Sequence, residues 1–472
     1  MSDQGKPKLV LSFEPTPALR AAYLAQAGIA NAFAGAQPGP FEMALKQHIA
    51  EAAPGTALAG TAAAAFSVLG CPSNDLRQEG EAGTPAASLP RLVVALDMAD
   101  QAAAAALLAT HQDIFGPSAS LGADLAISAL EEHWCPGEAA DPIFGDRAAA
   151  HRLLRAEGAL PGSAPVTVIM VDTGLPKEIL PKPPGFRGWE VGNASNPGAP
   201  LRRPGEPLTP HGAMVARNVR ALLPKARLLD CPLIPDGITD LKLFLSTAVA
   251  AFEQLEKTIR DVRATEAPGE ASAWIICNAW GVFDPSAESA AGPGLSYTRN
   301  PRHPLAQALR RLNALKVDIV FAAGNCGRHC PNRRCHPDFT GPGRSIHGAN
   351  AHPDVLTVGA VRSDALWLGY AAEGPGPVAL SHSKPDLAAP SHFAESDDAR
   401  RINTGTSAAC GVAAGAVALL RSHQGPDALP PESLRDLLRA KAWQPDGAPG
   451  WKPRTGFGIL DLQASLSALE SV

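Results

Sequence analysis

The sequence lacks any run of eighteen apolar residues, which excludes a membrane-spanning helix as the basis of its function. An excess of one charge is also missing. With 41 basic and 46 acidic residues the net charge is −5, so bulk electrostatics favour neither nucleic acid nor an anionic membrane as a partner. The first residues lack a signal peptide, because Glu14 and Pro15 interrupt a short apolar stretch. These absences predict a cytoplasmic location.

Cysteine is too sparse for a disulfide scaffold, with eight residues in a chain of 472. In a reducing compartment most of these cysteines should be free thiols. The apolar content of 45% and the charged content of 18% are typical of a soluble globular protein. A chain of this length is expected to form two to three domains, and no internal repeat is visible in it.

The pattern of apolar and polar residues changes at about residue 160. Residues 1–150 are rich in alanine and loop-like stretches, although 91–113 predicts a strand followed by a helix. Beyond residue 160, short apolar segments alternate with helical ones, which is typical of an α/β fold with a parallel sheet. The expected strands are 166–171, 226–233, 273–280, 317–323 and 355–361, and the expected helices are 211–223, 239–265 and 303–315.

Four polar residues stand where such a sheet would place an active site, at the carboxyl ends of strands or at the start of a helix. Asp172 and Asn325 each follow an expected strand, and His211 begins an expected helix. Each of these three also has an ordinary interpretation as a turn or structural residue. Ser407 heads a small, apolar segment, where it is either a helix N-cap or a nucleophile favoured by the helix N-terminus.

The order of these residues along the chain narrows the choice of chemistry. An α/β-hydrolase needs serine, then acid, then histidine. Only His423 follows Ser407, and no acidic residue lies between the two, so that arrangement is excluded. The order Asp172, His211, Ser407 matches the subtilisin arrangement instead.

Residues from about 160 to 465 resemble the subtilisin-like serine proteases, the subtilases. The matching motifs are VDTG around Asp172, HGAMVA around His211, AAGN ending at Asn325 and GTSAACGVAAGAVALL around Ser407. NAWG, HPDVLTVGAV, KPDLAAP and TGFGILDLQAS give further support. The resemblance implies a three-layer α/β/α fold with a central parallel sheet, preceded here by a smaller N-terminal α+β region.

The resemblance also implies a serine endopeptidase. We expect no cofactor and assign no metal-binding residue, and calcium binding stays open. Ser407 would be the nucleophile, His211 the general base and acid, and Asp172 the group that orients the imidazole. Asn325 would donate to the oxyanion alongside the backbone N–H of Ser407. The small residues behind Ser407 would let its helix pack closely beneath the sheet.

The implied substrate contacts involve two segments. Ala279, Trp280 and Gly281 would form the edge against which an extended peptide pairs, and Gly324 and Cys326 would line the pocket for the side chain before the cut. Departures from the family pattern affect neighbours of the reacting groups. Ala213 and Met214 replace the usual Thr-His, Cys410 replaces a proline, and Ala279 lacks a hydroxyl.

A cysteine-rich loop follows Asn325 directly. Cys326, Cys330 and Cys335, with two histidines among them, could bind zinc, although the second CxxC pair of many zinc sites is missing. Free thiols, or one disulfide with one free cysteine, are the alternatives. Arginines at 328, 333, 334 and 344 hint at an acidic substrate or partner, or are simply solvated.

We divide the chain into an N-terminal regulatory or propeptide-like region, 1–150, and a peptidase domain, 151–472. The segment 91–128 could form the strand–helix–strand unit used by inhibitory segments of related proteases. We favour a regulatory domain that stays attached, and a possible regulatory partner would bind there. The leading interpretation is a serine endopeptidase that acts on a protein or peptide substrate. Two alternatives remain open: a catalytically silent peptide-binding protein, or a protease gated by a redox or metal response of the cysteine loop.

Overall fold

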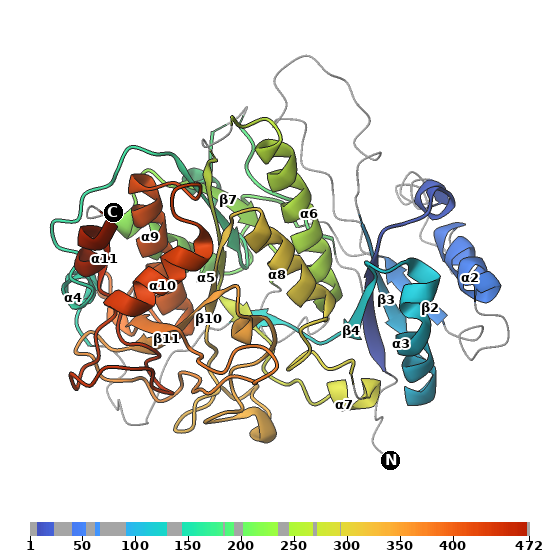
Figure 1. The fold of residues 1–472 in the computed structure, drawn as a ribbon. Helices are drawn as coiled ribbons and strands as arrows, with labels where there is room; N and C mark the ends of the chain where they lie inside the picture. Colours follow the sequence, from blue (N-terminus) through green and yellow to red (C-terminus); the bar gives the residue numbers. More distant parts are fainter. Residues whose placement is uncertain are drawn as a thin grey trace.

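The computed structural model describes residues 7–22, 40–52, 62–66, 91–129, 144–182, 185–192, 202–234, 245–267, 271–292 and 294–469. A large α/β unit carries most of these residues, and a smaller α+β unit from the N-terminal part lies beside it (Figure 1). Within the described ranges, no helix combines the length and the apolar character needed to cross a bilayer.

Six parallel strands form the central sheet of the large unit, in the order β12-β11-β10-β8-β6-β7. Their bounds are β6 (Val166–Val171), β7 (Arg227–Cys231), β8 (Ala273–Asn278), β10 (Asp318–Ala322), β11 (Leu356–Val361) and β12 (Leu387–Pro390). The first five strands confirm the strands expected from the sequence. The sixth, β12, was not expected, because its four residues, LAAP, carry no β-branched side chain.

The sheet is covered on both faces, because consecutive side chains of a strand point to opposite sides. In β6, Val168 and Met170 join the core that contains α5 and α9, whereas Ile169 and Val171 join the core that contains α6 and α8. The helices are α5 (His211–Leu222), α6 (Leu245–Arg263), α8 (Pro304–Ala314) and α9 (Gly405–His423). This arrangement confirms the expected three-layer α/β/α fold.

Helices α5 and α9 approach each other closely because of glycine. A Cβ on Gly411 would lie 2.7 Å from the carbonyl oxygen of Val215, and one on Gly415 would lie 3.0 Å from that of Asn218. The small residues behind Ser407 therefore let its helix pack against the helix that begins at His211. This contact fixes the relative positions of the two helix N-termini.

Short elements complete the fold. They are α4 (Arg147–Leu153), α7 (Glu288–Ala291), α10 (Pro431–Lys441), α11 (Leu462–Leu469), the 3-10 helices Lys177–Ile179, Pro337–Phe339 and Gly348–Ala351, and the hairpin of β13 (Phe393–Ala394) and β14 (Ile402–Asn403). Arg147 in α4 binds Glu395 through two hydrogen bonds of 2.6 Å. This helix therefore packs on the large unit although it begins before residue 151.

The smaller unit is an antiparallel sheet in the order β2-β3-β1-β4 with helices on the side away from the large unit (Figure 1). Its elements are β1 (Lys8–Phe13), α2 (Pro40–Ala52), β2 (Ala62–Phe66), β3 (Leu92–Asp97), α3 (Gln101–Phe115) and β4 (Ser120–Ala123). The succession β3–α3–β4 confirms the strand–helix–strand unit expected over 91–128. The boundary at 150 between regulatory region and peptidase domain stays a prediction.

The small sheet packs on α6 and α8 and shares one apolar core with them. Polar contacts accompany this core. Ser12 donates to Glu253 in α6 over 3.0 Å, and the Asp124 carboxylate accepts the backbone N–H of Ser246 in the first turn of α6 over 2.7 Å. Burial raises the pKa of Asp124 to about 7. At Gly122, a Cβ would collide with the ring of His303, so the approach requires glycine there.

Candidate active site

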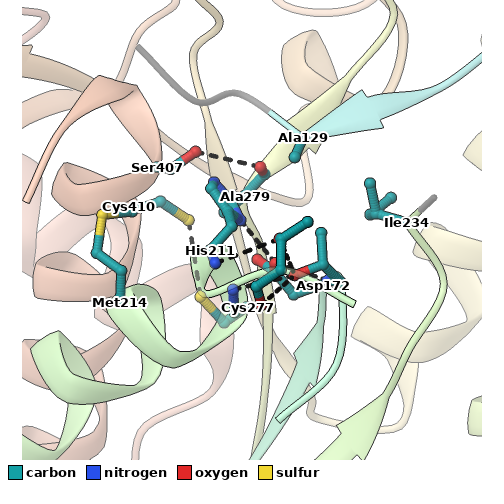
Figure 2. A network of polar contacts seen from close by, with 12 residues as sticks. Ala129, Asp172, His211, Met214, Ile234, Cys277, Ala279, Ser407 and Cys410 are labelled. Carbon is teal, nitrogen blue, oxygen red and sulfur yellow. Dashed lines mark hydrogen bonds and ion pairs between the residues drawn. The ribbon is translucent and has the colours of Figure 1, made fainter. Parts of the chain in front are cut away.

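Asp172 and His211 form a short hydrogen bond at the carboxyl edge of the sheet. Asp172 follows the last residue of β6, and His211 is the first residue of α5. His211 Nδ1 lies 2.6 Å from Asp172 Oδ1, and both residues are buried (Figure 2). The same carboxylate oxygen accepts the backbone N–H of Thr173 over 2.7 Å. A carboxylate held in this way can orient an imidazole and stabilise its protonated form.

The sequence did not reveal the residues that hold this pair in place. Thr173 Oγ1 accepts the backbone N–H of Gly212 over 3.2 Å, and Thr209 donates to the same oxygen over 3.0 Å. Asp230 in β7 accepts the backbone N–H groups of Leu175 and Gly205, each over 3.0 Å, so it fastens the chain that leaves Asp172. Burial, and the negative charge of nearby Asp172, raise the pKa of Asp230 to about 7. An acidic residue among the apolar residues LLDC of β7 was the sequence signal that could have identified Asp230.

Ser407 lies in the first turn of α9 and is not its N-cap. The helix begins at Gly405, and Thr404 is the capping position, with extended backbone. The interpretation of Ser407 as a cap is therefore wrong, because the helix begins before it. Its hydroxyl donates instead to the carbonyl oxygen of Ala279 over 3.2 Å, and the residue is fully buried (Figure 2).

Asn325 lies next to the first turn of α9, which contains Ser407. The chain turns at Gly324, whose φ of 116° suits glycine, and this turn brings Asn325 against the start of α9. Asn325 Oδ1 accepts the backbone N–H of Thr406 over 3.0 Å and the Thr406 hydroxyl over 2.8 Å. Because Thr406 precedes Ser407, these bonds hold the Asn325 amide next to Ser407. The sequence motifs assigned no role to Thr406.

The predicted substrate edge is a short strand, β9 (Trp280–Gly281). It pairs antiparallel with β5 (Ser128–Ala129), which comes from the N-terminal part of the chain. Ser128 lies opposite Gly281, and Ala129 lies opposite Trp280. The Trp280 side chain is buried between aromatic rings, so the edge offers its backbone. The protein's own chain thus occupies the edge expected to bind a peptide.

A small cavity lies beside Asn325. Gly281, Gly324 and Cys326, three of the residues assigned to substrate binding from the sequence, line it together with Phe283. The structure therefore brings these predicted residues to one place. Their role in recognising a side chain stays a prediction.

The cysteine loop contains a disulfide between Cys326 and Cys335, and Cys330 is disulfide-bonded as well. The expectation of free thiols is wrong for this loop, because the turn at residues 332–335 brings Cys335 back to Cys326. A zinc site made of these three thiolates is excluded for the same reason. Within the described ranges, no group of three His, Cys, Asp or Glu side chains could hold a metal ion.

The chain matches the Subtilase family model over residues 189–458, which is more than half of its length. The match includes His211, Asn325 and Ser407 but begins after Asp172. No curated protein sequence matches the chain at a significant level.

Two solved structures show the same fold. The epidermin leader peptide processing serine protease EpiP of Staphylococcus aureus superposes with a TM-score of 0.50 at 14% identity, covering 98% of each chain. Fervidolysin from Fervidobacterium pennivorans, described as a keratinolytic enzyme related to subtilisin, superposes with a TM-score of 0.51 at 14% identity. That alignment covers 98% of this chain but 61% of fervidolysin, so this chain spans less than two thirds of it. At these identities the likeness shows the fold alone.

A parallel sheet with Asp172, His211 and Ser407 at its edge, in that chain order, has the architecture of a subtilisin-type serine protease. The family match agrees with this architecture. The chain belongs to the subtilase family of serine proteases.

Proposed function

We propose that the protein hydrolyses peptide bonds with Ser407 as nucleophile, His211 as general base and acid, Asp172 as the orienting carboxylate and Asn325 as an oxyanion donor. The observation that carries the proposal is the 2.6 Å contact between buried Asp172 and His211 on elements that pack against the Ser407 helix. A protease of this family acts on protein or peptide substrates.

The proposed mechanism assigns one step to each of these groups. Ser407 Oγ attacks the peptide carbonyl, and His211 Nε2 takes the hydroxyl proton while Asp172 stabilises the imidazolium. The Asn325 amide and the Ser407 backbone N–H stabilise the negative charge that develops on the carbonyl oxygen. The imidazolium then protonates the leaving amine, and a water molecule, activated by His211, releases the acyl group from Ser407.

A cleavage assay tests this proposal. The full-length protein is incubated with a peptide library, and the products are sequenced by mass spectrometry. We expect new termini within the peptides and a recurring preference near the cut. A catalytically silent binder, the alternative function, would retain peptides on the protein without producing new termini.

We further propose that residues 1–150 restrain the protease by holding β5 in the substrate cleft. Ser128 and Ala129 pair with the edge that a substrate would need, so segment and substrate compete. The segment is anchored just before the cleft, where the Leu125 carbonyl accepts the backbone N–H of Leu245 over 2.8 Å. The shared core with α6 and α8 adds a large apolar contact. A regulatory partner that binds this region would act by removing β5.

We expect this region to stay attached in the active protein. Purified protein that cleaves peptides should run at full length, and intact-mass spectrometry should find the original N-terminus. The opposite outcome is activity that appears only with a truncation near residues 140–165 and that is lost in Ser407→Ala because the cut no longer occurs. That outcome would identify the region as a propeptide removed by the protein itself.

The disulfide of the cysteine loop bears on the predicted cytoplasmic location. Disulfides persist mainly in oxidising compartments. The Cys326–Cys335 bridge is therefore an argument against a cytoplasmic location. The cytoplasmic location stays a prediction. The bridge closes a short loop directly after Asn325. A loop of this size contributes up to about 3 kcal/mol in the chain-entropy account.

We therefore expect Cys335→Ser to lower the melting temperature and to change the cleavage profile more than the chemical step. The physical reason is that the loop borders the cavity beside Asn325. Differential scanning calorimetry and library cleavage measure both effects, and Cys231→Ser, at a free buried cysteine in β7, is the control for losing a sulfur atom. An unaltered melting temperature with an unaltered profile would show that the bridge has no such role.

A further inference from the structure

We propose that Arg334 binds the main-chain carbonyl of the second substrate residue before the cleaved bond, on the strand edge opposite β9. This inference rests on the proposed peptidase function, in which β5 marks the path of a substrate. The role goes beyond the substrate edge expected from the sequence, because it adds a contact from the other side of the substrate strand.

The strand register gives the position of that carbonyl. Ala129 lies opposite Trp280 in the antiparallel pair of β5 and β9. The next residue of a peptide in this register would lie opposite Ala279, whose carbonyl oxygen is 3.2 Å from Ser407 Oγ. The residue opposite Ala279 therefore carries the carbonyl that Ser407 attacks, and Ala129 stands in for the residue before it.

Arg334 reaches Ala129 from the cysteine loop. Its Nη2 donates to the Ala129 carbonyl oxygen over 3.1 Å, and its Nε donates to Asn332 Oδ1 over 3.0 Å. The guanidinium carbon lies 4.1 Å from the centre of the Phe283 ring, which is a cation–π contact. The planar guanidinium is thus held by an aromatic face and by an amide oxygen while it donates to the strand. A lysine ammonium could not make this planar, forked set of contacts.

The same loop carries Arg334 and the predicted oxyanion donor. The Asn325 carbonyl accepts the backbone N–H of Asn332 over 2.9 Å, and the Asn332 carbonyl accepts that of Cys335 over 2.9 Å. The disulfide between Cys326 and Cys335 closes this turn on both sides. A displacement of Arg334 would therefore displace Asn325 as well. Substrate binding by Arg334 and stabilisation of the oxyanion by Asn325 are thus linked.

The contact between Arg334 and the carbonyl oxygen would fix the position of the substrate strand relative to β9. On one side, the backbone of β9 pairs with the strand, and on the other, a charged donor holds one carbonyl. Hydrogen bonds that involve a charged group are stronger than neutral ones. Fixing the carbonyl before the scissile one limits the movement of the scissile peptide group relative to Ser407, which favours a geometry suited to attack.

Hydrogen exchange in the full-length protein tests the contact without any added ligand. We compare Arg334→Gln with Arg333→Gln, which replaces the exposed neighbouring arginine. Both substitutions are made in the Ser407→Ala background to prevent cleavage. We expect amides in 124–129 and 279–283 to exchange about tenfold faster in Arg334→Gln and at the parent rate in Arg333→Gln. Equal rates in all three proteins would overturn the proposal. Arg334→Lys keeps the positive charge but lacks the planar guanidinium group. It should give an intermediate exchange rate, which separates a loss of the fold from a loss of the guanidinium contacts.

A modified peptide then tests whether a substrate uses the contact. The probe is a synthetic peptide with the sequence of residues 124–133, prepared with an ordinary amide or with a thioamide at the Ala129 carbonyl, because sulfur is the weaker acceptor. The two dissociation constants are measured within one protein, so competition from the attached β5 cancels in their ratio. We expect the amide peptide to bind about fivefold more tightly than the thioamide in the Ser407→Ala parent and in Arg333→Gln, and equally in Arg334→Gln. A ratio that is the same in all three proteins, or no binding of either peptide, would contradict the role toward substrates.

Failure of the proposed function would look different. In that case the protein with Ser407 intact would cleave no peptide in the library assay, whereas exchange rates and binding ratios would still report on Arg334. Cleavage that is normal while Arg334→Gln behaves like Arg333→Gln would reject the inference and leave the proposed function in place.

Discussion

Replacing Ser407 with alanine is expected to abolish measurable peptide hydrolysis and to leave the fold intact. The hydroxyl is the group that would form the covalent intermediate, and its present contact with the Ala279 carbonyl makes a small contribution to folding. A residual acceleration of ~10³–10⁴ over water should remain from the oxyanion donors and substrate binding. Peptide turnover and thermal unfolding, measured on the same preparation, check both parts of this expectation.

Ser422→Ala provides a matched control on the same helix. Ser422 lies in the last turn of α9, where its hydroxyl bonds to the Leu419 carbonyl and to the backbone N–H of Gly162. Its loss should lower stability without lowering turnover per folded molecule. Turnover in Ser407→Ala that equals that of the parent would contradict the assignment of the nucleophile.

Replacing Asn325 with alanine is expected to lower kcat by ~10²–10³, or about 2.7–4 kcal/mol, if the amide stabilises the oxyanion. The alanine change also removes the acceptor of two hydrogen bonds from Thr406, so a disturbed helix start is a competing cause. Asn325→Asp keeps that acceptor and loses the N–H donor. Asn325→Asp should therefore lose at least as much activity as Asn325→Ala, because its carboxylate also repels the oxyanion.

Thr406→Val is the control for this experiment. It removes the hydroxyl that donates to Asn325 but leaves the amide nitrogen and the backbone bond in place. We expect a smaller loss of kcat in Thr406→Val than in Asn325→Asp. A loss below threefold in Asn325→Ala would mean that the side chain does not meet the oxyanion.

The central sheet could be predicted from the sequence because its strands are buried on both faces. Strands such as β6, VTVIMV, consist almost entirely of apolar and β-branched residues, and this composition is visible without a structure. Strand β12 was not predicted because its sequence, LAAP, contains no β-branched residue. It becomes a strand only by pairing with β11.

The site could be predicted as a set of residues but not as a geometry. The motifs identified Asp172, His211, Asn325 and Ser407, because each stands at the end of an expected strand or the start of an expected helix. The same motifs could not show how these groups are held. Thr406, Asp230 and Thr173 act through hydrogen bonds to residues distant in sequence, and no local pattern records such pairs.

The contacts from outside the peptidase motifs were the least predictable. The pairing of β5 with β9 joins residues 128–129 to 280–281, and such a short strand has no periodicity to read. The disulfide was one of several possibilities, because cysteine spacing alone does not give connectivity. Arg334 looked like one solvated arginine among four until its contacts with Phe283 and Ala129 placed it beside the cleft.

Labelling with a fluorophosphonate probe tests the central claim, nucleophilic catalysis by Ser407, most directly. The probe reacts with a serine only when a neighbouring base activates the hydroxyl. We predict one covalent adduct per chain, mapped to Ser407 by peptide mass spectrometry, and no adduct in Ser407→Ala or after replacement of His211 with alanine. Addition at another serine, or no adduct on a protein that cleaves peptides, would contradict the account.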